Sequence, residues 1–239
     1  KNRPMEYTLI TQIGFIALSI LCLGLVYVGL GKAAEKEGEV FRQKIQTRFL
    51  MGSLAWLAIL SLLSLSGFLY NFELPPPFLI VLIVPLVTLV LILRSAAFQR
   101  VLAHIPASWL VYLQAFRIVV EGLLWLLFLD NVIPVQMSFE GRNLDVLVGL
   151  TAPFAAFLFF RSGNIQKRAG IIWNIFGLIL LANIVITALL STPTPLRVFM
   201  NEPANTIVVL FPYVFLPGIL VPLAYYLHIL SLRQLLKSA

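Results

Sequence analysis

Long apolar stretches recur along the whole chain and constrain its fold more than any other feature. Seven can be placed, at residues 8–30, 49–70, 78–94, 108–130, 144–161, 169–190 and 206–232. Runs of about 20 apolar residues are typical of helices that cross the hydrocarbon core of a bilayer. The sequence therefore predicts an all-α fold: a polytopic membrane protein built as a bundle of seven transmembrane helices.

Composition and connector length indicate a single transmembrane domain over residues 1–239. The chain is 60% hydrophobic and 11% charged, and an average soluble domain has about twice that charged fraction. The connectors are short, as in a compact helical bundle. The net charge of +7 comes from basic residues in short loops, where charge sets membrane orientation, so we expect no nucleic-acid partner.

The positions of lysine and arginine predict how the bundle is oriented, because basic residues concentrate in cytoplasmic loops. Twelve fall on one side: Lys32, Lys36, Arg42, Lys44, Arg48, Arg94, Arg100, Arg161, Lys167, Arg168, Arg233 and Lys237. Four fall on the other side: Lys1, Arg3, Arg142 and Arg197. We therefore expect the N-terminus outside, the C-terminus in the cytoplasm, and a multi-pass protein of the bacterial cytoplasmic membrane.

The connectors differ between the two sides. On the inner side, residues 35–48 have helix-compatible charge and are expected to extend the second span, and residues 94–106 form a short amphipathic piece. On the outer side, residues 130–145 and 191–206 are the least membrane-like parts of the chain. Asn143 or Asp145 is a plausible N-cap of the fifth span. Caps and turns explain most of these residues; the alternative is that both loops fold together over the outer mouth of the bundle.

The fourth span has charges at its centre. Gln114, Arg117 and Glu121 follow one another at helical spacing, so they share one face of the helix. A charge at this depth costs from about 3 to over 10 kcal/mol, so it is kept where something pairs or uses it. Arg117 and Glu121 therefore either pair with each other and fix the packing, or form a proton- or ion-handling site or an anchor for an anionic ligand.

Few polar side chains are available to meet this centre. Asn183 on the sixth span is the first candidate partner, because its estimated depth is close to that of Glu121. Possible further lining residues are Thr88, Thr151, Asn174 and Tyr213. We take Gln114, Arg117, Glu121 and Asn183 as the predicted central polar site.

The last span contains Pro212, Pro217 and Pro222, spaced five residues apart. Each proline removes a backbone donor and leaves a carbonyl group unpaired, which membranes tolerate where neighbouring groups compensate. A static kink and a hinge that lines a polar cavity are both consistent with this pattern.

Several kinds of site are excluded or weakly supported by the residues present. Every lysine falls in a loop or terminus, so a retinal Schiff base is excluded. The single cysteine, Cys22, rules out an intrachain disulfide and a cysteine-based metal site. Two histidines, His104 and His228, are weak candidates for haem ligation. No metal-hydrolase motif, phosphate loop or activated nucleophile is present, so we predict no metal, no cofactor and no catalytic residue.

Three stretches resemble a group of uncharacterised bacterial inner-membrane proteins. They are FRIVVEGLLWLLFL (116–129), MSFEGRNLDVLVGLTAP (137–153) and FPYVFLPGILVPLAYYLHILSLRQL (211–235). The resemblance covers about the C-terminal half of the chain. It implies a bacterial seven-helix membrane protein and brings no activity with it.

Three functions fit this pattern. The leading hypothesis is a transporter of a small polar solute or ion, with the central polar site on the fourth span and the proline-rich seventh span as its gate. The second is a signalling or assembly subunit, in which the charges lock the packing and the outer loops meet a partner. The third is an intramembrane enzyme that modifies a lipid, with Glu121 as acid or base and Arg117 holding a phosphate. The bilayer is the one partner expected in all three, and the oligomeric state stays open.

Overall fold

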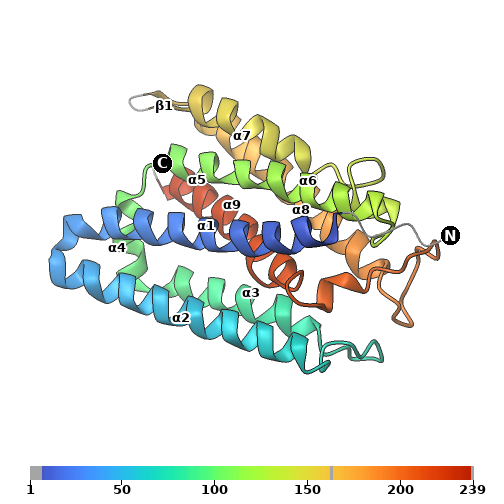
Figure 1. Ribbon diagram of the computed structural model, residues 1–239. Coiled ribbons are helices and arrows are strands. Elements are labelled where there is room, and N and C mark those ends of the chain that lie inside the picture. The colour runs from blue at the N-terminus through green and yellow to red at the C-terminus, as the bar shows by residue number, and fades with distance from the viewer. Residues whose placement is uncertain (1–6, 162–163, 238–239) are drawn as a thin grey trace.

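The computed structural model describes residues 7–161 and 164–237 and shows a bundle of long helices (Figure 1). The helices are α1 (Thr8–Ala34), α2 (Glu39–Leu65), α3 (Leu79–Arg94), α4 (Ala96–His104), α5 (Ala107–Tyr112), α6 (Phe116–Leu129), α7 (Val146–Phe159), α8 (Lys167–Leu190) and α9 (Val221–Lys237). One antiparallel pair, β1 (Phe160–Arg161) and β2 (Asn164–Ile165), joins α7 to α8. The all-α prediction is confirmed.

Five helical segments of the described residues are long and apolar enough to cross a membrane. They are Thr8–Glu37, Glu39–Leu65, Ala107–Leu129, Lys167–Leu190 and Leu216–Lys237. A sixth candidate is the pair α3 and α4, which meets at a bend of 83°. The remaining apolar helix, α7, is shorter. Length and composition therefore support five to six membrane-spanning helices.

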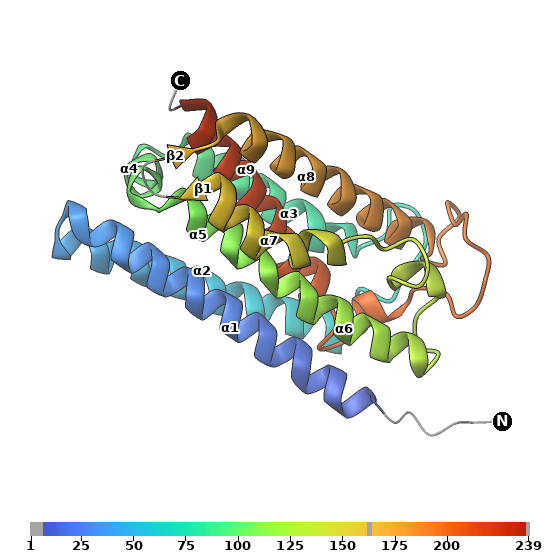
Figure 2. The ribbon, with the colours of Figure 1, turned by 90° about the horizontal axis from the view of Figure 1, so that it is seen from above.

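The chain runs back and forth between two ends of the bundle (Figure 2). One end holds the α1–α2 turn, α4, the β1–β2 pair and the end of α9. The other end holds the start of α1 and the connectors 66–78, 130–145 and 191–215. The predicted extension of the second span is confirmed for residues 39–48, because α2 begins at Glu39, whereas Glu35–Glu37 form a separate 3₁₀ turn. Lys1 and Arg3, which entered the charge comparison, lie outside the described residues.

Apolar side chains cover the outer faces of the helices, and two charged side chains of α6 are buried between them. Large hydrophobic residues are exposed on the outer faces of the helices, among them Ile13, Phe154 and Ile172. Arg117 and Glu121 are each only 2% exposed. Exposed apolar surface on this scale is unfavourable in water and matches a hydrocarbon surround. The pattern supports a membrane location.

The two long connectors at the same end of the bundle touch each other. The Gln136 amide donates to the Ser191 hydroxyl at 2.9 Å, and the Asn201 amide donates to the Gln136 carbonyl oxygen at 2.7 Å. The Arg142 guanidinium lies over the Phe199 ring, 5.2 Å from its centroid. The sequence alternative in which both loops fold together is therefore confirmed.

The last predicted span begins later than residue 206. Residues 207–209 form a 3₁₀ turn, and regular helix starts with the π-helical turn Leu216–Leu220, which continues into α9. Pro212 therefore precedes the helix, Pro217 lies in the π turn and Pro222 lies in the first turn of α9. Proline is readily accepted at the start of a helix, which suits Pro217, whereas Pro222 follows a complete turn and leaves one carbonyl without its helical donor.

A tryptophan of α2 donates a hydrogen bond to a backbone carbonyl group of this π turn. The Trp56 Nε1–H donates to the Gly218 carbonyl oxygen at 2.8 Å. Pro222, four residues after Gly218, has no N–H to offer that carbonyl. The indole therefore replaces a missing helical donor and ties α2 to the start of α9.

Trp56→Phe keeps the aromatic ring and deletes this donor. We expect the free energy of unfolding to fall by about 1–3 kcal/mol, the cost of leaving a buried carbonyl unpaired. Equilibrium unfolding in mixed micelles, followed by circular dichroism, measures the change. In a Pro222→Ala background the helix gains its own N–H, so the same substitution should cost less. An equal cost in both backgrounds would contradict this account.

Candidate functional site

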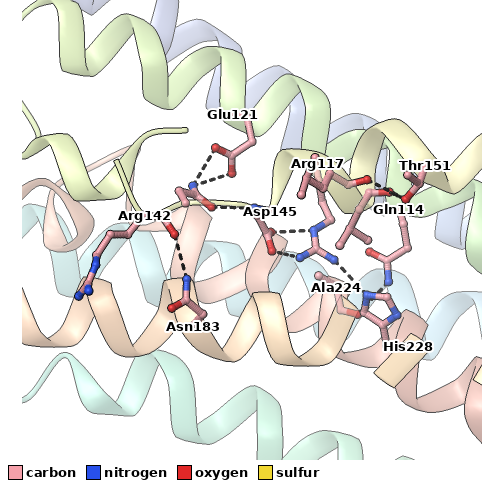
Figure 3. A network of polar contacts seen from close by, with 12 residues as sticks. Gln114, Arg117, Glu121, Arg142, Asp145, Thr151, Asn183, Ala224 and His228 are labelled. Carbon is pink, nitrogen blue, oxygen red and sulfur yellow. Dashed lines mark hydrogen bonds and ion pairs between the residues drawn. The ribbon is translucent and has the colours of Figure 1, made fainter. Parts of the chain in front are cut away.

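One face of α6, with the turn before it, carries the polar centre. Arg117 and Glu121 lie on the buried face of α6 together with Val120 and Leu124. Gln114, in the 3₁₀ turn Leu113–Ala115, is 1% exposed. The prediction that Gln114, Arg117 and Glu121 share a face of the fourth span is confirmed. All three point into the bundle (Figure 3).

Arg117 pairs with Asp145 and not with Glu121, which corrects the first sequence interpretation. Its Nε donates to Asp145 Oδ2 at 2.7 Å, and its Nη2 donates to Asp145 Oδ1. This two-point contact is the strongest geometry that arginine and carboxylate can adopt. Asp145 does precede α7, but its side chain makes no capping bond and turns to the arginine instead.

A chain of hydrogen bonds continues from Arg117 through α9 to α8. Arg117 Nη1 lies 3.0 Å from His228 Nε2, and His228 Nδ1 lies 2.9 Å from Asn174 Oδ1. The Asn174 amide donates to the Ser231 hydroxyl at 3.0 Å and to the Gly170 carbonyl oxygen at 2.8 Å.

The hydrogen bonds from Arg117 to Asn174 allow one consistent assignment of donors and acceptors. Because a guanidinium can only donate, His228 Nε2 must accept. The imidazole proton then sits on Nδ1 and is donated to Asn174, so His228 is neutral in this network. Asn174, predicted as a possible lining residue, is thus part of the site through His228.

Glu121 is held by an amide. Asn143 Nδ2 donates to both carboxyl oxygens of Glu121 at 2.7 Å, and also to the Met137 carbonyl oxygen at 3.1 Å. Asn143 Oδ1 accepts from the Asp145 backbone N–H at 3.1 Å, which is an Asx turn. The turn that orients Asn143 toward Glu121 therefore also places Asp145 beside Arg117.

Gln114 ties α9 to the same face. Its amide donates to the Ala224 carbonyl oxygen at 3.2 Å. Its Oε1 is buried and, in the described residues, has no protein partner. A buried amide oxygen of this kind is a ready acceptor for a water molecule or a ligand donor.

The structure removes Asn183 from the predicted central site. Asn183 is exposed on α8 and donates to the Arg142 carbonyl oxygen at 2.9 Å, away from Glu121 (Figure 3). The helical phase of α8 turns Asn174 inward and Asn183 outward. Depth along a helix is therefore insufficient to choose a partner.

The other candidate lining residues also lie apart from the charges. Thr88 is exposed on α3 and donates to the Val84 carbonyl oxygen. Thr151 accepts from the Trp173 indole at 3.1 Å. Tyr213 shares a hydrogen bond with the Thr11 hydroxyl at 3.1 Å, near the start of α1.

A small cavity of about 80 Å³ touches this network on the side of the long connectors. Glu121, Asn143 and Asp145 contribute its polar lining, together with Thr192 and Asn205. Asn205 Oδ1 is buried with no hydrogen-bond partner among the described residues. The remaining lining is apolar and comes mainly from α3, α8 and the π turn. The space and the free acceptor suit a few water molecules.

The sequence interpretation missed four residues of the network: Asn143, Asp145, His228 and Ser231. Asn143 or Asp145 was expected to be a helix cap, and His228 was considered only as a weak candidate for haem ligation. One signal could have found His228: Ala224, His228 and Ser231 recur at helical spacing on the face of α9 that is buried. For Asp145 the signal was weaker, because acidic residues before a helix are ordinary caps.

In the described residues there is no cluster of three or more histidine, cysteine or acidic side chains arranged to hold a metal ion. The three nitrogens of the Arg117 guanidinium are all engaged, two by Asp145 and one by His228. The arginine therefore has little capacity left for a phosphate or another anion. What the site offers chemically is a carboxyl group, Glu121, beside a small cavity.

Asp145→Asn removes the charge that neutralises Arg117. We expect the free energy of unfolding to fall by about 3–5 kcal/mol, because an unpaired charge stays buried. The matched control is Glu202→Gln, which neutralises the partner of Arg197 where the carboxyl side chain is 71% exposed. That change should cost about 1 kcal/mol or less. Equal losses of unfolding free energy in Asp145→Asn and Glu202→Gln would contradict the assignment of Asp145 as the buried partner of Arg117.

Gly177→Ala tests the packing of α8 on His228. A methyl group at Gly177 would overlap the His228 ring, whereas one at Gly122 on α6 would meet nothing within 4 Å. Overpacking in Gly177→Ala should lower the free energy of unfolding by about 1–3 kcal/mol. The thermal unfolding midpoint of this variant should therefore fall. Gly122→Ala should leave the midpoint unchanged or raise it, because alanine favours helix. If both variants unfold alike, His228 is not held as described.

Comparison with known proteins places the chain in one family. Neither curated proteins nor solved structures give a match. A protein family does match residues 75–236, a segment that runs from the connector before α3 almost to the end of α9 and contains the whole network. The chain therefore belongs to the family described as Domain of unknown function (DUF8737).

Proposed function

We propose that the protein is a transporter of a small polar solute or ion in a bacterial cytoplasmic membrane, and that Glu121 is its proton- or cation-binding carboxyl group. The observation that carries the proposal is the position of Glu121, which is buried and lines a cavity. Arg117 is paired with Asp145, so Glu121 has no positively charged partner in the network. Intramembrane carboxyl groups in such surroundings are typical of proton and ion pathways.

The charge balance singles out Glu121. Arg117 contributes one positive charge, Asp145 cancels it, and His228 is neutral because it accepts from the arginine. No lysine or arginine among residues 7–161 and 164–237 forms an ion pair with Glu121, whose oxygens are bound by the neutral amide of Asn143. A buried carboxyl without a cationic partner is stable only if it holds a proton or a bound cation.

The cavity gives Glu121 a route for exchange. Its lining includes Thr192 and Asn205 of the second long connector, so it lies toward the end of the bundle where the two connectors meet. Leu216 and Pro217 of the π turn form part of its wall. π turns and proline positions are the places where membrane helices bend most readily, which favours this segment as the gate. Pro217 and Pro222 then take the hinge role, with Pro212 at its edge.

The topology in this proposal has seven spans. The short helices α3 and α7 cross the bilayer, and α4 lies along one surface after the 83° bend. Support comes from the alternation of the chain between the two ends of the bundle and from the basic residues at the end that holds the α1–α2 turn and α4. By the distribution of lysine and arginine, that end is cytoplasmic and the N-terminus is outside.

Proton flux into proteoliposomes tests the role of Glu121. Vesicles that contain the purified protein and a pH-sensitive dye receive an acid pulse, with potassium and valinomycin to balance charge. Glu121→Gln should lower proton entry by about a hundredfold, the scale on which a positioned acid–base group acts. Glu121→Asp keeps the carboxyl group and should retain part of the flux.

The matched control is Glu73→Gln, which changes an exposed glutamate in the connector after α2 and should leave flux unchanged. Circular dichroism and gel filtration establish that each variant is folded. Wild-type flux in folded Glu121→Gln, or wild-type protein no faster than protein-free vesicles, would overturn the proposal.

A further inference from the structure

A second, larger cavity lies apart from the charged network. It is a groove of about 470 Å³ between α1, α2, α3 and the first turns of α9. Apolar side chains line most of it, and the small residues Gly52, Ser53 and Ala55 make its wall on α2 shallow. Its volume falls in the range of about 300–1,000 Å³ that is typical of ligand sites.

The groove lies beside a helix that the bundle hardly covers. Of the described residues in α2, Leu60 and Ser64 are the buried ones. The helix packs mainly on α1 and forms an edge of the molecule (Figure 1). The wall of the groove on α2 therefore faces the surroundings of the protein, which in a bilayer are lipid chains.

The two ends of the groove differ in charge. Ile59 marks one end on α2 and Arg48 the other, eleven residues earlier. At 1.5 Å per residue the two are about 17 Å apart along the helix axis, which is a large part of one leaflet. Arg48 is exposed and has no acidic partner in the described part of the chain. An unpaired guanidinium at the end of an apolar groove complements a headgroup phosphate.

We propose that this groove binds one phospholipid with an anionic headgroup. Arg48 contacts the headgroup phosphate, and an acyl chain lies along the apolar floor toward Ile59. In the proposed orientation Arg48 belongs to the cytoplasmic side, where basic residues near the surface attract anionic lipid. The bound lipid would contact the Trp56 side chain, which donates to Gly218 of the π turn.

This inference does not depend on the transport proposal. The groove touches the π turn through Gly218 and Ile219, whereas the cavity of Glu121 touches it through Leu216 and Pro217. Lipid binding can therefore be present or absent whatever the result of the proton-flux experiment.

Native mass spectrometry of the detergent-solubilised full chain tests the site, with phosphatidylglycerol and phosphatidylcholine of identical acyl chains as probes. We expect tighter binding of phosphatidylglycerol. Arg48→Ala should weaken that binding about fivefold, the effect of one basic residue near an anionic surface. Gly52→Leu should abolish it, because a side chain at Gly52 meets nothing within 4 Å and would extend into the groove.

Matched controls lie outside the groove. Arg168→Ala removes another exposed arginine, at the start of α8, and Gly122→Leu enlarges another helical glycine with open space around it. Both should bind phosphatidylglycerol like the wild type. Equal affinity for the two lipids, or a loss in Gly52→Leu without one in Arg48→Ala, would overturn the anionic-lipid assignment. Binding unchanged in both groove variants would overturn the site itself.

Discussion

The ion pair between Arg117 and Asp145 is the interaction on which the rest of the interior depends. A buried guanidinium without a partner would cost the fold about 3–5 kcal/mol. The pair joins α6 to the start of α7, and the third nitrogen of the guanidinium extends it to His228 on α9 and from there to Asn174 on α8. Four helices are thereby fixed around one charge, and each nitrogen of the guanidinium has an acceptor.

The hydrogen bonds divide the network into two parts. Arg117, Asp145, His228 and Asn174 use their hydrogen bonds on one another, so they fix helix packing and have little left to offer a ligand. Glu121 is the exception, because it needs only the amide of Asn143 and faces the cavity. The same Asx turn places Asp145 beside Arg117 and the Asn143 amide beside Glu121, so the ion pair and the amide-bound carboxyl group lie one helical turn apart on α6.

Sequence patterns predicted the helical class, the buried face of the fourth span and the extension of α2, because hydrophobic length and helical period determine them directly. The identity of the partners was not predictable in the same way. Asn183 and Asn174 are both asparagines on one apolar helix, and only the packing of α8 on α9 decides which faces inward. Asp145 sits where a helix cap is expected, so its ion pair with Arg117 had no local signal. The late start of the last helix follows from how the connector 191–215 packs, which is a tertiary property.

The central claim is that Glu121, alone among the charged groups of the network, exchanges protons through the cavity. Infrared difference spectroscopy of the reconstituted protein between acid and alkaline pH tests it most directly. The claim predicts a carboxyl C=O band that appears in the wild type, shifts in D₂O and is missing from Glu121→Gln but not from Glu73→Gln. A Glu121→Gln spectrum identical to that of the wild type would show that Glu121 never titrates, and would contradict the account.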